Sequence, residues 1–557
     1  MCYIVNVRTK TTTEYDMRLL DYNAVENRFE LRSPYDRELV AAMRNLQGRR
    51  WVAADKVNAV AATRDRLDGV MVFCKQHDFN VSDAASKKIS DLNSTDEKMA
   101  RGEIKDRLSG VSWQLYDYQI DGVEHIVNKK RCFIGDEMGT GKTIQAIAGL
   151  VVANAFPAVV VCPAAVKLNW KKEIEKGVGE ICQVVDGKTV LDLSSKIYII
   201  NYDILSKKLK ELKSLKPAAV VLDESHYIKN SKSSRSKAAV ALGRVCEYRI
   251  CLSGTPIKNR PIEFARQFDF MGHLGRFGGY VEFGKKYCNG KSTRYGWDFK
   301  GSSNSDELNN ELNSSFYLRR EKKDVLKQLK SKSRHNVYFD IDNRAEYRAA
   351  ESSIWDFMKE KNPDKPVSRD DRAEALVLIS QLKQIAAVGK IAAAKQWVHD
   401  VIDNEKLVLF VYHREVLTSI RDEFKCPVIF GGMSATAKQQ SIDKFVNNPL
   451  CRLICINIKA GGTGIDGLQH AASRCAFLEL DWTPADHDQA EDRLHRNGQL
   501  NPVDCYYLLA NNTIDDDIFA LIQKKREIIE NVVSGAAGTN DTDPLQELLQ
   551  LFTKKIK

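Results

Sequence analysis

The chain has 557 residues, 43% of them hydrophobic and 28% charged, with a formal net charge of +10. This length predicts three or four domains at roughly 150 residues each, and the mild basic excess by itself indicates an ordinary solvated surface. The 13 cysteines are scattered through apolar runs without a CxxC pair, which argues against a disulfide framework or a zinc site and indicates a reducing compartment. No apolar run approaches the ~20 residues of a membrane span.

The first part of the chain is set off by a polar stretch. The sequence SDAASKKISDLNSTDEKMARGEIK, which begins at residue 82, is rich in charged and small polar residues. It predicts a connector over residues 84–110 that separates a small α+β domain, residues 1–83, from the remainder.

Two series of short apolar runs follow. The first series is RCFIG (131–135), AVVVCP (158–163), AAVVLDE (218–224) and YRICLSG (248–254), and the second is LVLFVY (407–412), RLICIN (452–457), CAFLEL (475–480) and DCYYLL (504–509). Each run is continuous rather than alternating, which is typical of strands covered on both faces of a sheet. With helical patterns between them, they predict an α/β fold with two parallel sheets, over residues 111–270 and 391–512.

The remaining segments are predicted to be helical. Residues 271–390, between the two series, are rich in Phe, Tyr, Lys and Arg and are expected to form a mostly helical insertion. Residues 513–557 begin with an amphipathic pattern, with Ile514, Ile518, Leu521 and Ile522 on one side, so we expect a helix that packs against the rest of the protein.

A phosphate-binding loop is predicted where RCFIGDEMGTGKT (131–143) joins a strand to a helix. Glycines let main-chain N–H groups face phosphates, and the helix N-terminus adds positive potential. Lys142 is expected to reach the β and γ phosphates, and the Thr143 hydroxyl to hold Mg²⁺; a structural glycine-rich turn is the alternative. The predicted nucleotide ligands in this loop are Asp136, Gly139, Thr140, Gly141, Lys142 and Thr143.

Two adjacent carboxylates leave a later strand of the first series. Buried ionised groups are costly unless they are paired or metal-bound, so Asp223 is predicted to bind Mg²⁺ and Glu224 to polarise an attacking water. A helix cap is the alternative for this pair. Upstream of the loop, Gln119 is placed to read an adenine edge by paired hydrogen bonds, although by itself it would be an ordinary polar residue on a helix.

The motifs, taken in order, resemble those of the SWI/SNF-related ATPases of helicase superfamily II. The resemblance covers about residues 115–530, and aspartate at position 136 is usual in that family. It rests on DEMGTGKT (136–143), VVCPAAVKLNW (160–170), DESHYIKN (223–230), LSGTPIKN (252–259), AGGTGIDGLQHA (460–471) and QAEDRLHRNGQ (489–499).

The family's fold implies two RecA-like parallel-sheet lobes with ATP and Mg²⁺ in the cleft between them. Gln489, Arg493 and Arg496 recur at i, i+4 and i+7, which predicts that they share one helix face. A face with two guanidinium groups suits a triphosphate across a cleft, and a solvated basic face is the alternative. By resemblance, Arg493 and Arg496 would be arginine fingers and Gln489 a nucleotide ligand.

The resemblance also implies contacts with DNA. Ser253 and Thr255 would couple the ATP state to DNA contact, as the corresponding motif does in the family. Lysines, amides and hydroxyls at strand ends bind phosphates without reading bases, so weak sequence preference is expected. The residues expected to contact the DNA backbone are Lys167, Lys229, Asn230, Thr463 and Trp482.

The first domain resembles the HARP module of annealing helicases. Its segment FELRSPYDRELVAAMRNLQGRRW (29–51) contains a Pro-Tyr-Asp turn, a helix and a Gly-Arg-Arg-Trp turn. Arg49 and Arg50 beside Trp51 suit forked or single-stranded DNA, through phosphate pairing and base stacking. The alternative is that Trp51 anchors the core of this small domain.

Three functions are therefore open, and the first is favoured. It is an ATP-dependent translocase on double-stranded DNA that remodels or reanneals forked DNA. The second is a strand-separating DNA or RNA helicase, and the third is a motor that displaces or recruits polymerase, recombination or repair proteins. The N-terminus has no signal-peptide pattern, and no histone-reading segment follows the motor, so we expect a cytoplasmic protein of a bacterium or a phage-infected cell, or a nuclear one in a eukaryote.

Overall fold

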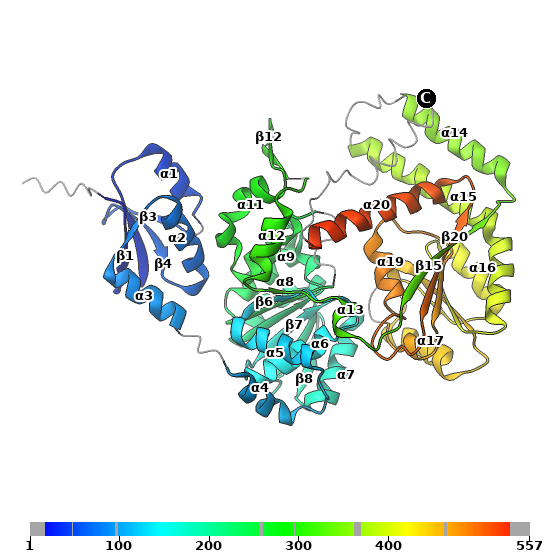
Figure 1. The fold of residues 1–557 in the computed structure, drawn as a ribbon, viewed down its shortest axis with the longest axis horizontal. Helices are drawn as coiled ribbons and strands as arrows, with labels where there is room; N and C mark the ends of the chain where they lie inside the picture. Colours follow the sequence, from blue (N-terminus) through cyan, green and yellow to red (C-terminus); the bar gives the residue numbers. More distant parts are fainter. Residues whose placement is uncertain are drawn as a thin grey trace, which may run out of the picture.

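The computed structural model describes residues 17–46, 48–94, 99–254, 260–294, 296–299, 301–360, 369–461 and 465–534. Its strands form a five-stranded sheet, a seven-stranded sheet, a six-stranded sheet and a two-stranded hairpin. Figure 1 shows the three larger sheets in chain order, each with its own helices. We call the unit built on the seven-stranded sheet lobe 1 and the unit built on the six-stranded sheet lobe 2.

The first domain is a small α+β unit. Strands β1, β2, β4 and β3 pair antiparallel, and β5 pairs parallel with β1. Three helices cover the sheet, and their apolar residues, such as Leu39 and Val70, meet Phe29 and Leu31 in one core. The strands are β1 (Leu19–Asn23), β2 (Arg28–Arg32), β3 (Arg50–Val52), β4 (Val57–Ala61) and β5 (Asn80–Val81), and the helices are α1 (Arg37–Arg44), α2 (Arg64–Gln76) and α3 (Asp83–Ser94).

Lobe 1 contains a parallel sheet with the strand order β14-β6-β11-β10-β7-β9-β8. Separate cores lie on its two faces, so the continuous apolar runs of the sequence are explained by burial on both sides. The strands are β6 (Arg131–Ile134), β7 (Ala158–Cys162), β8 (Cys182–Val184), β9 (Ile197–Asn201), β10 (Ala219–Asp223), β11 (Tyr248–Leu252) and β14 (Tyr317–Leu318). The helices are α4 (Arg101–Arg107), α5 (Asp117–Lys129), α6 (Lys142–Val152), α7 (Lys167–Val178), α8 (Tyr202–Ser214), α9 (Ser234–Gly243), α10 (Glu263–Met271), α11 (Gly279–Tyr287), α12 (Ser305–Asn313) and α13 (Lys322–Val325).

Lobe 2 repeats this architecture with the strand order β15-β20-β19-β16-β18-β17, all parallel. The strands are β15 (Lys332–Phe339), β16 (Leu407–Val411), β17 (Val428–Ile429), β18 (Leu453–Asn457), β19 (Arg474–Phe477) and β20 (Val503–Ala510). The helices are α14 (Arg344–Glu360), α15 (Arg369–Ile402), α16 (Arg414–Phe424), α17 (Ala435–Asn447), α18 (Ile458–Gly461), α19 (Pro484–Glu491) and α20 (Ile514–Ser534). The predicted fold class is therefore confirmed.

The segment predicted as a helical insertion, 271–390, also contributes a strand to each lobe. Strand β14 pairs with β6 at the edge of lobe 1, and β15 pairs with β20 over eight residues at the edge of lobe 2. The pattern of β15, KSRHNVYF, is mostly exposed, as an edge strand allows, so it lacks the continuous apolar run by which β16, β18, β19 and β20 were predicted. The chain therefore crosses from lobe 1 to lobe 2 between residues 318 and 332.

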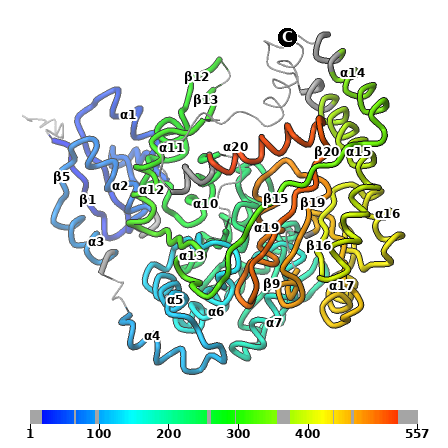
Figure 2. The backbone as a smooth tube through the Cα atoms, turned by 45° about the vertical axis from the view of Figure 1, so that its right-hand side comes forward, coloured from blue at the N-terminus to red at the C-terminus, as the bar shows by residue number. Residues whose placement is uncertain are grey.

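Helix α20 carries the chain back toward lobe 1. It packs on α15, α19 and β20 of lobe 2 and also contacts α12 of lobe 1. Figure 1 and Figure 2 both show it extending from lobe 2 across the front of lobe 1. The amphipathic pattern predicted for this segment has its apolar side in the core of lobe 2, where Ile514, Ile518 and Ile522 are buried.

One described helix has a stretch apolar and long enough to cross a membrane by length and composition, Glu374–Ile402 of α15. Its apolar residues are shared between the two cores of lobe 2: Ile379, Leu382 and Ala386 lie in one, and Ala394 and Val398 in the other. This is the pattern of a core helix wedged beside a sheet. All 12 cysteines in the described ranges are free thiols.

The junction of α15 and α20 gives a stability prediction. Lys390 is buried, donates to the carbonyl of Leu508 at 2.6 Å and forms an ion pair with buried Asp515. Lys390→Met should lower the free energy of unfolding by about 3–5 kcal/mol, because it leaves Asp515 as an uncompensated buried charge. Denaturant unfolding would measure this. The control is Lys395→Met, whose partly exposed pair with Glu423 should contribute less than about 1 kcal/mol; equal losses would contradict the prediction.

Candidate active site

The predicted phosphate-binding loop lies between β6 and α6. Gly139 and Gly141 have φ angles of +81° and +83°, a conformation that side chains with a Cβ rarely adopt. Thr140 closes the turn, because its hydroxyl donates to the carbonyl of Glu137 at 2.8 Å. Lys142 begins α6 and half-buried Thr143 is its second residue, so both stand at the positive end of the helix, where an anion is favoured.

Lys142 spans this loop. Its ammonium donates to the carbonyls of Asp136 at 2.8 Å and Glu137 at 3.0 Å. Burial lowers the pKa of Lys142, while the charges of Glu224, Asp136 and Asp223 raise it. The lysine is thus held over the loop by two carbonyl oxygens, which a phosphate oxygen could replace.

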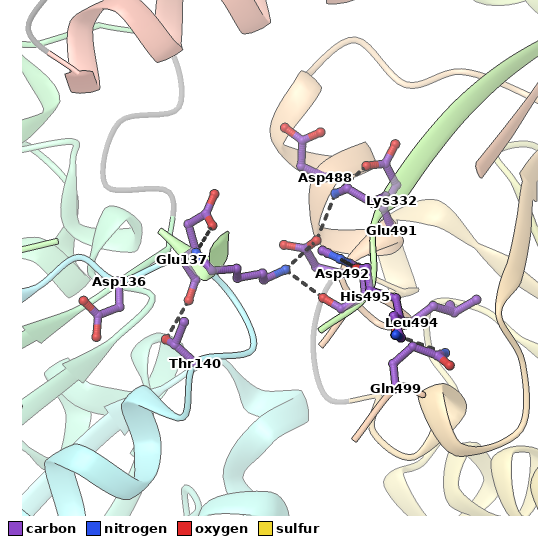
Figure 3. Close-up of polar contacts among 12 residues, drawn as sticks. Asp136, Glu137, Thr140, Lys332, Asp488, Glu491, Asp492, Leu494, His495 and Gln499 are labelled. Carbon is purple, nitrogen blue, oxygen red and sulfur yellow. Dashed lines mark hydrogen bonds and ion pairs between the residues drawn. The ribbon is translucent and has the colours of Figure 1, made fainter. Parts of the chain in front are cut away.

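The side chain of Asp136, predicted as a nucleotide ligand, makes structural contacts within lobe 1 instead. Its carboxylate is fully buried and receives hydrogen bonds from Arg320 at 2.5 and 3.0 Å and from Gln145 at 3.2 Å. The side chain therefore ties β6 to α6 and to the segment after β14, and only its main-chain carbonyl faces Lys142. Figure 3 shows the carboxylate directed away from Glu137 and Thr140.

The predicted catalytic carboxylates, Asp223 and Glu224, lie at the end of β10, and their surroundings shift their pKa values in opposite directions. Asp223 accepts from the indole N–H of Trp170 at 2.8 Å, and burial together with the charge of Glu224 raises its pKa. Burial also disfavours the charge of Glu224, but hydrogen bonds from His226 and Ser253 and the charge of Lys142 outweigh it and lower its pKa. Glu224 is therefore held ionised beside Ser253, whose hydroxyl lies 3.0 Å from it.

Gln119 lies against the loop from α5. Its side-chain N–H donates to the carbonyl of Thr140 at 3.1 Å, and its oxygen accepts from the main-chain N–H of Tyr116 at 3.0 Å. Tyr118 donates to the same Thr140 carbonyl at 2.9 Å. The amide of Gln119 is thus fixed at the rim of the loop, and adenine recognition by it stays a prediction.

The prediction that Gln489, Arg493 and Arg496 share a helix face is wrong. Helix α19 ends at Glu491, and the two arginines lie in the turn that follows. The N–H groups of Arg493 and Leu494 bond to carbonyls three residues earlier, which tightens the chain and ends the α-helix. Gln489 stays buried within α19.

The turn after α19 nevertheless faces lobe 1. We call this turn, residues 492–498, the finger turn, after the predicted arginine fingers that it contains. A Cβ on Gly139 would lie 2.7 Å from the Cβ of Arg496, so the finger turn approaches the phosphate loop closely. Arg496 also pairs with Asp466 at 3.1 Å. Arg493 donates to the carbonyl of Ile465 at 3.0 Å, and burial and Arg496 lower its pKa to about 10 while the charge of Glu224 opposes this.

A bridge that the sequence prediction missed joins the two sides of the cleft. The main-chain N–H of Lys322 donates to the carboxylate of Glu137 at 2.5 Å, and its ammonium contacts Asp492 and the carbonyl of His495, each at 2.8 Å. Figure 3 shows the residues on the two sides of this bridge, Glu137 in the loop of lobe 1 and Asp492 and His495 after α19. Strand β15 holds the same helix end, because Lys332 pairs with Glu491 at 2.9 Å and Asp492 at 3.1 Å.

The residues predicted to contact DNA are spread over both lobes. Lys229 is ion-paired with Glu263 at 2.9 Å, and Asn230 next to it is exposed. Lys167 begins α7 and donates to the carbonyl of Val185 at 3.2 Å. Trp482 packs on the core of lobe 2 beneath the ammonium of Lys383, 4.8 Å from its ring centre, so it is half-buried rather than free to stack.

The remaining residues predicted for DNA contact or coupling are in the first domain or outside the described ranges. Arg49 donates to the side chain of Asn58 at 2.6 Å, and Arg50 and Trp51 are exposed on β3. Exposure of Trp51 excludes the alternative that it anchors the core of that domain. Thr255 and Thr463 lie outside the residues that the structure describes.

The missed residues had weak signals in the sequence. Arg320 and Lys322 lie in the charged segment LRREKKDV (318–325), which is typical of solvated surface. Glu137 lies within the loop motif DEMGTGKT, where nothing in the sequence indicated a partner for it. Trp170 and His226 lie within motifs that carried the family resemblance. The hydrogen bond from Trp170 to Asp223 depends on strands β7 and β10 being neighbours, so sheet order makes these two residues partners. The contact of His226 with Glu224 is local, because the two residues are two positions apart directly after β10.

Comparison with known proteins agrees with this arrangement. The SNF2-related domain matches residues 44–388, and the helicase conserved C-terminal domain matches residues 389–498. The Drosophila melanogaster SWI/SNF-related matrix-associated actin-dependent regulator of chromatin subfamily A-like protein 1 is 33% identical over 433 residues, which are 75% of this chain and 56% of that protein. The mouse DNA annealing helicase and endonuclease ZRANB3 is 30% identical over 445 residues, 76% of this chain and 41% of that protein.

A solved structure, the Sulfolobus solfataricus SWI2/SNF2 ATPase core in complex with dsDNA, matches 80% of this chain and 97% of its own with 25% identity and a TM-score of 0.37. Because the SNF2-related domain spans more than half of the sequence, the chain belongs to the SNF2-related family. Its second matched domain, the helicase conserved C-terminal domain, follows the first directly in the chain. The chain spans about half the length of the curated relatives named above, which come from animals, so the expected bacterial or phage origin stays a prediction.

The buried carboxylate pair gives a stability prediction of unusual sign. Asp223→Asn should raise the free energy of unfolding at pH 7 by about 1–3 kcal/mol, because the native fold disfavours the charge and the Trp170 hydrogen bond can persist. The gain should shrink as the pH falls toward 3.8, the ordinary value at which the unfolded carboxyl group also becomes neutral. Denaturant unfolding without nucleotide or divalent ions measures it, with exposed Asp203→Asn as control. A loss of stability would contradict the prediction.

The bridge gives a prediction about turnover. Lys322→Ala should lower the rate of ATP hydrolysis about 2- to 30-fold, because the phosphate loop and the finger turn lose their shared contact, while nucleotide affinity changes less. Lys323→Ala, which removes an exposed neighbour paired only with Glu321 among the described residues, should hydrolyse ATP at the wild-type rate. Steady-state hydrolysis and binding of a fluorescent nucleotide measure the two quantities. Equal effects of the two substitutions would contradict this role.

Proposed function

We propose that the protein is an ATP-driven translocase on double-stranded DNA that remodels or reanneals forked DNA. The observation that carries the proposal is the approach of Arg496 in lobe 2 to Gly139 in the phosphate loop of lobe 1. A nucleotide in this cleft touches both lobes, so its hydrolysis changes how strongly they are held together. The relative named as a DNA annealing helicase supports DNA as the substrate and the reannealing of its strands as the activity.

The residues present fit ATP and Mg²⁺. Main-chain N–H groups at Gly139 to Lys142 and the Lys142 ammonium would hold the phosphates, and the Thr143 hydroxyl and the Asp223 carboxylate would hold the ion. Bound Mg²⁺ would supply neutralisation of charge on the phosphates. Glu224, kept ionised by Ser253 and His226, would accept a proton from the attacking water, and Arg493 and Arg496 would stabilise charge on the transferred phosphoryl group.

Translocation would follow from the same geometry. Ser253 donates to Glu224 and belongs to the motif LSGTPIKN (252–259), which also contains Thr255. The state of the ATP site can therefore be transmitted through this motif toward DNA. Lys167, Lys229 and Asn230 on lobe 1 and Thr463 and Trp482 on lobe 2 would contact the DNA backbone, so that opening and closing of the cleft advances one lobe along the duplex. Arg49, Arg50 and exposed Trp51 of the first domain would engage the fork.

The substrate is tested by steady-state ATP hydrolysis with no nucleic acid, then with duplex, forked and single-stranded DNA and with RNA, at one salt concentration, because backbone binding falls steeply with salt. Forked and duplex DNA should stimulate most, and DNA annealing assays should then show activity. Preference for RNA or plain single strands would favour the strand-separating helicase instead. A DNA-stimulated motor that fails in annealing but releases a bound polymerase would favour the protein-displacement function.

Two substitutions separate binding from turnover. Lys142→Ala should abolish hydrolysis by weakening nucleotide binding, and Glu224→Gln should abolish hydrolysis while nucleotide still binds, because only the acceptor for the proton of water is lost. Both variants should still bind duplex DNA. Hydrolysis at the wild-type rate by Lys142→Ala would overturn the assignment of this site.

A further inference from the structure

A two-stranded hairpin that none of the motor motifs includes projects from lobe 1. Strands β12 (Lys291–Thr293) and β13 (Gly296–Asp298) pair antiparallel, with Ser292 opposite Trp297. Figure 1 and Figure 2 show it standing out beyond α11 and α12, at the end of lobe 1 opposite α4. A hairpin of this size is marginal by itself, so its position must be fixed at its base.

The base of the hairpin is fixed by Phe299. Its ring occupies the space that a Cβ on Gly284 of α11 would need, and it meets the ring of Tyr280 edge-on at 5.6 Å between centres. A glycine at position 284 therefore lets the ring lie directly on the helix. The hairpin is mounted on α11 rather than hanging from a loop.

The upper part of the hairpin exposes an indole among cations. The Trp297 side chain is 44% exposed, and its ring is parallel to that of Phe299 within 6°. The ammonium of Lys285 lies 4.8 Å from the indole centre. Lys291 and Arg294 are exposed on the strand and the turn.

Two lysines of α11 near the hairpin are already paired with carboxylates. Lys285 pairs with Glu282 at 2.8 Å, and Lys286 pairs with Glu307. Arg294 is the exposed cation at the turn, and Lys291 is exposed on β12 opposite Asp298 in the strand register. An exposed indole beside such cations is the arrangement by which proteins stack an unpaired base and hold the adjoining phosphates, whereas paired bases inside a duplex present no free face for stacking.

The 3-10 helix that packs against α11 also contacts the first domain. The backbones of Gly69 in α2 and Gly275 in the 3-10 helix η4 (Leu274–Phe277) nearly touch, since a Cβ on Gly69 would lie 3.4 Å from the Cα of Gly275. A hollow of about 370 Å³ beside this contact is lined by α1 and α2 and by Lys286 and Tyr287 of α11. The hairpin and the domain predicted to bind forks thus rest on the same part of lobe 1.

We propose that hairpin β12–β13 is a second nucleic-acid contact that binds unpaired bases at the branch of a DNA fork. Trp297 stacks on a base, and Lys291 and Arg294 pair with the neighbouring phosphates. The proposal rests on the proposed function, because it takes DNA as the substrate, and it adds a site within lobe 1 that distinguishes a fork from a plain duplex.

The test is the affinity of the full chain for a labelled fork with single-stranded arms and for a blunt duplex of equal length, at one salt concentration. Trp297→Ala should weaken fork binding about 5- to 150-fold and leave duplex binding and duplex-stimulated ATP hydrolysis within about twofold. Trp297→Phe, which keeps an aromatic ring, should restore most of the affinity. Tyr338→Ala removes an equally exposed aromatic side chain from β15 and is the matched control.

Abasic sites in the arms next to the branch make the test specific for stacking. They should weaken fork binding by the wild-type chain and by Tyr338→Ala but not by Trp297→Ala, since the stacking partner is already missing. Arg294→Ala, at the exposed turn, tests the phosphate contact without touching the indole and should weaken fork binding more than duplex binding.

Three results would overturn the hairpin site. Unchanged fork affinity of Trp297→Ala and Arg294→Ala would remove the hairpin contact and leave the translocase proposal intact. Equal losses on fork and duplex would show a general backbone contact rather than recognition of unpaired bases. If the wild-type chain bound neither DNA, the proposed function itself would fall, and the hairpin proposal with it.

Discussion

Lys322 lies where the chain leaves lobe 1 for lobe 2, and it is bound on both sides. Its main-chain N–H is held by Glu137 of the phosphate loop, and its ammonium is held by Asp492 and the carbonyl of His495 at the end of α19. The ion pair of Lys322 with Asp492 fixes the distance between the two halves of the nucleotide site. The finger turn, its approach to Gly139 and any response to nucleotide all depend on this crossing.

A second constraint is the cost of charge at the site. The fold raises the pKa of Asp223 and lowers that of Glu224, although the two are neighbours in sequence, because Glu224 receives the hydrogen bonds of His226 and Ser253. In lobe 2, the charges of buried Glu491 and partly buried Asp492 are compensated because Lys322, Lys332 and Arg334 surround them. Burying these charges costs stability, but it orients them before a nucleotide binds. Charges oriented in this way are the condition for electrostatic stabilisation of a reacting phosphoryl group.

Much of the fold could be predicted from the sequence, because parallel strands buried on both faces leave continuous apolar runs. The edge strands β14 and β15 could not, since an edge carries no such signal. Short β8 and β17 were also missed, and so was β9, although it is a continuous buried run. The residues of the phosphate loop were predicted in sequence, but the inward-facing carboxylate of Asp136 was not, because its partner Arg320 is 184 residues away. The helix predicted through Arg493 and Arg496 failed for a local reason: hydrogen bonds to carbonyls three residues back end α19 at Glu491.

The central claim is that one ATP site is completed by a side chain from each lobe, and the direct test is hydrolysis by Arg496→Ala. The account predicts that the rate of hydrolysis falls by about 10³-fold or more, with ATP binding within about tenfold of the wild type, because lobe 1 alone holds the phosphates. Asp466→Ala, which removes the partner of Arg496 in lobe 2 and local hydrogen bonds to Gly467 and Gln469 but keeps the guanidinium group, should be far less impaired. Hydrolysis by Arg496→Ala at the wild-type rate would contradict the claim that lobe 2 takes part in the chemistry.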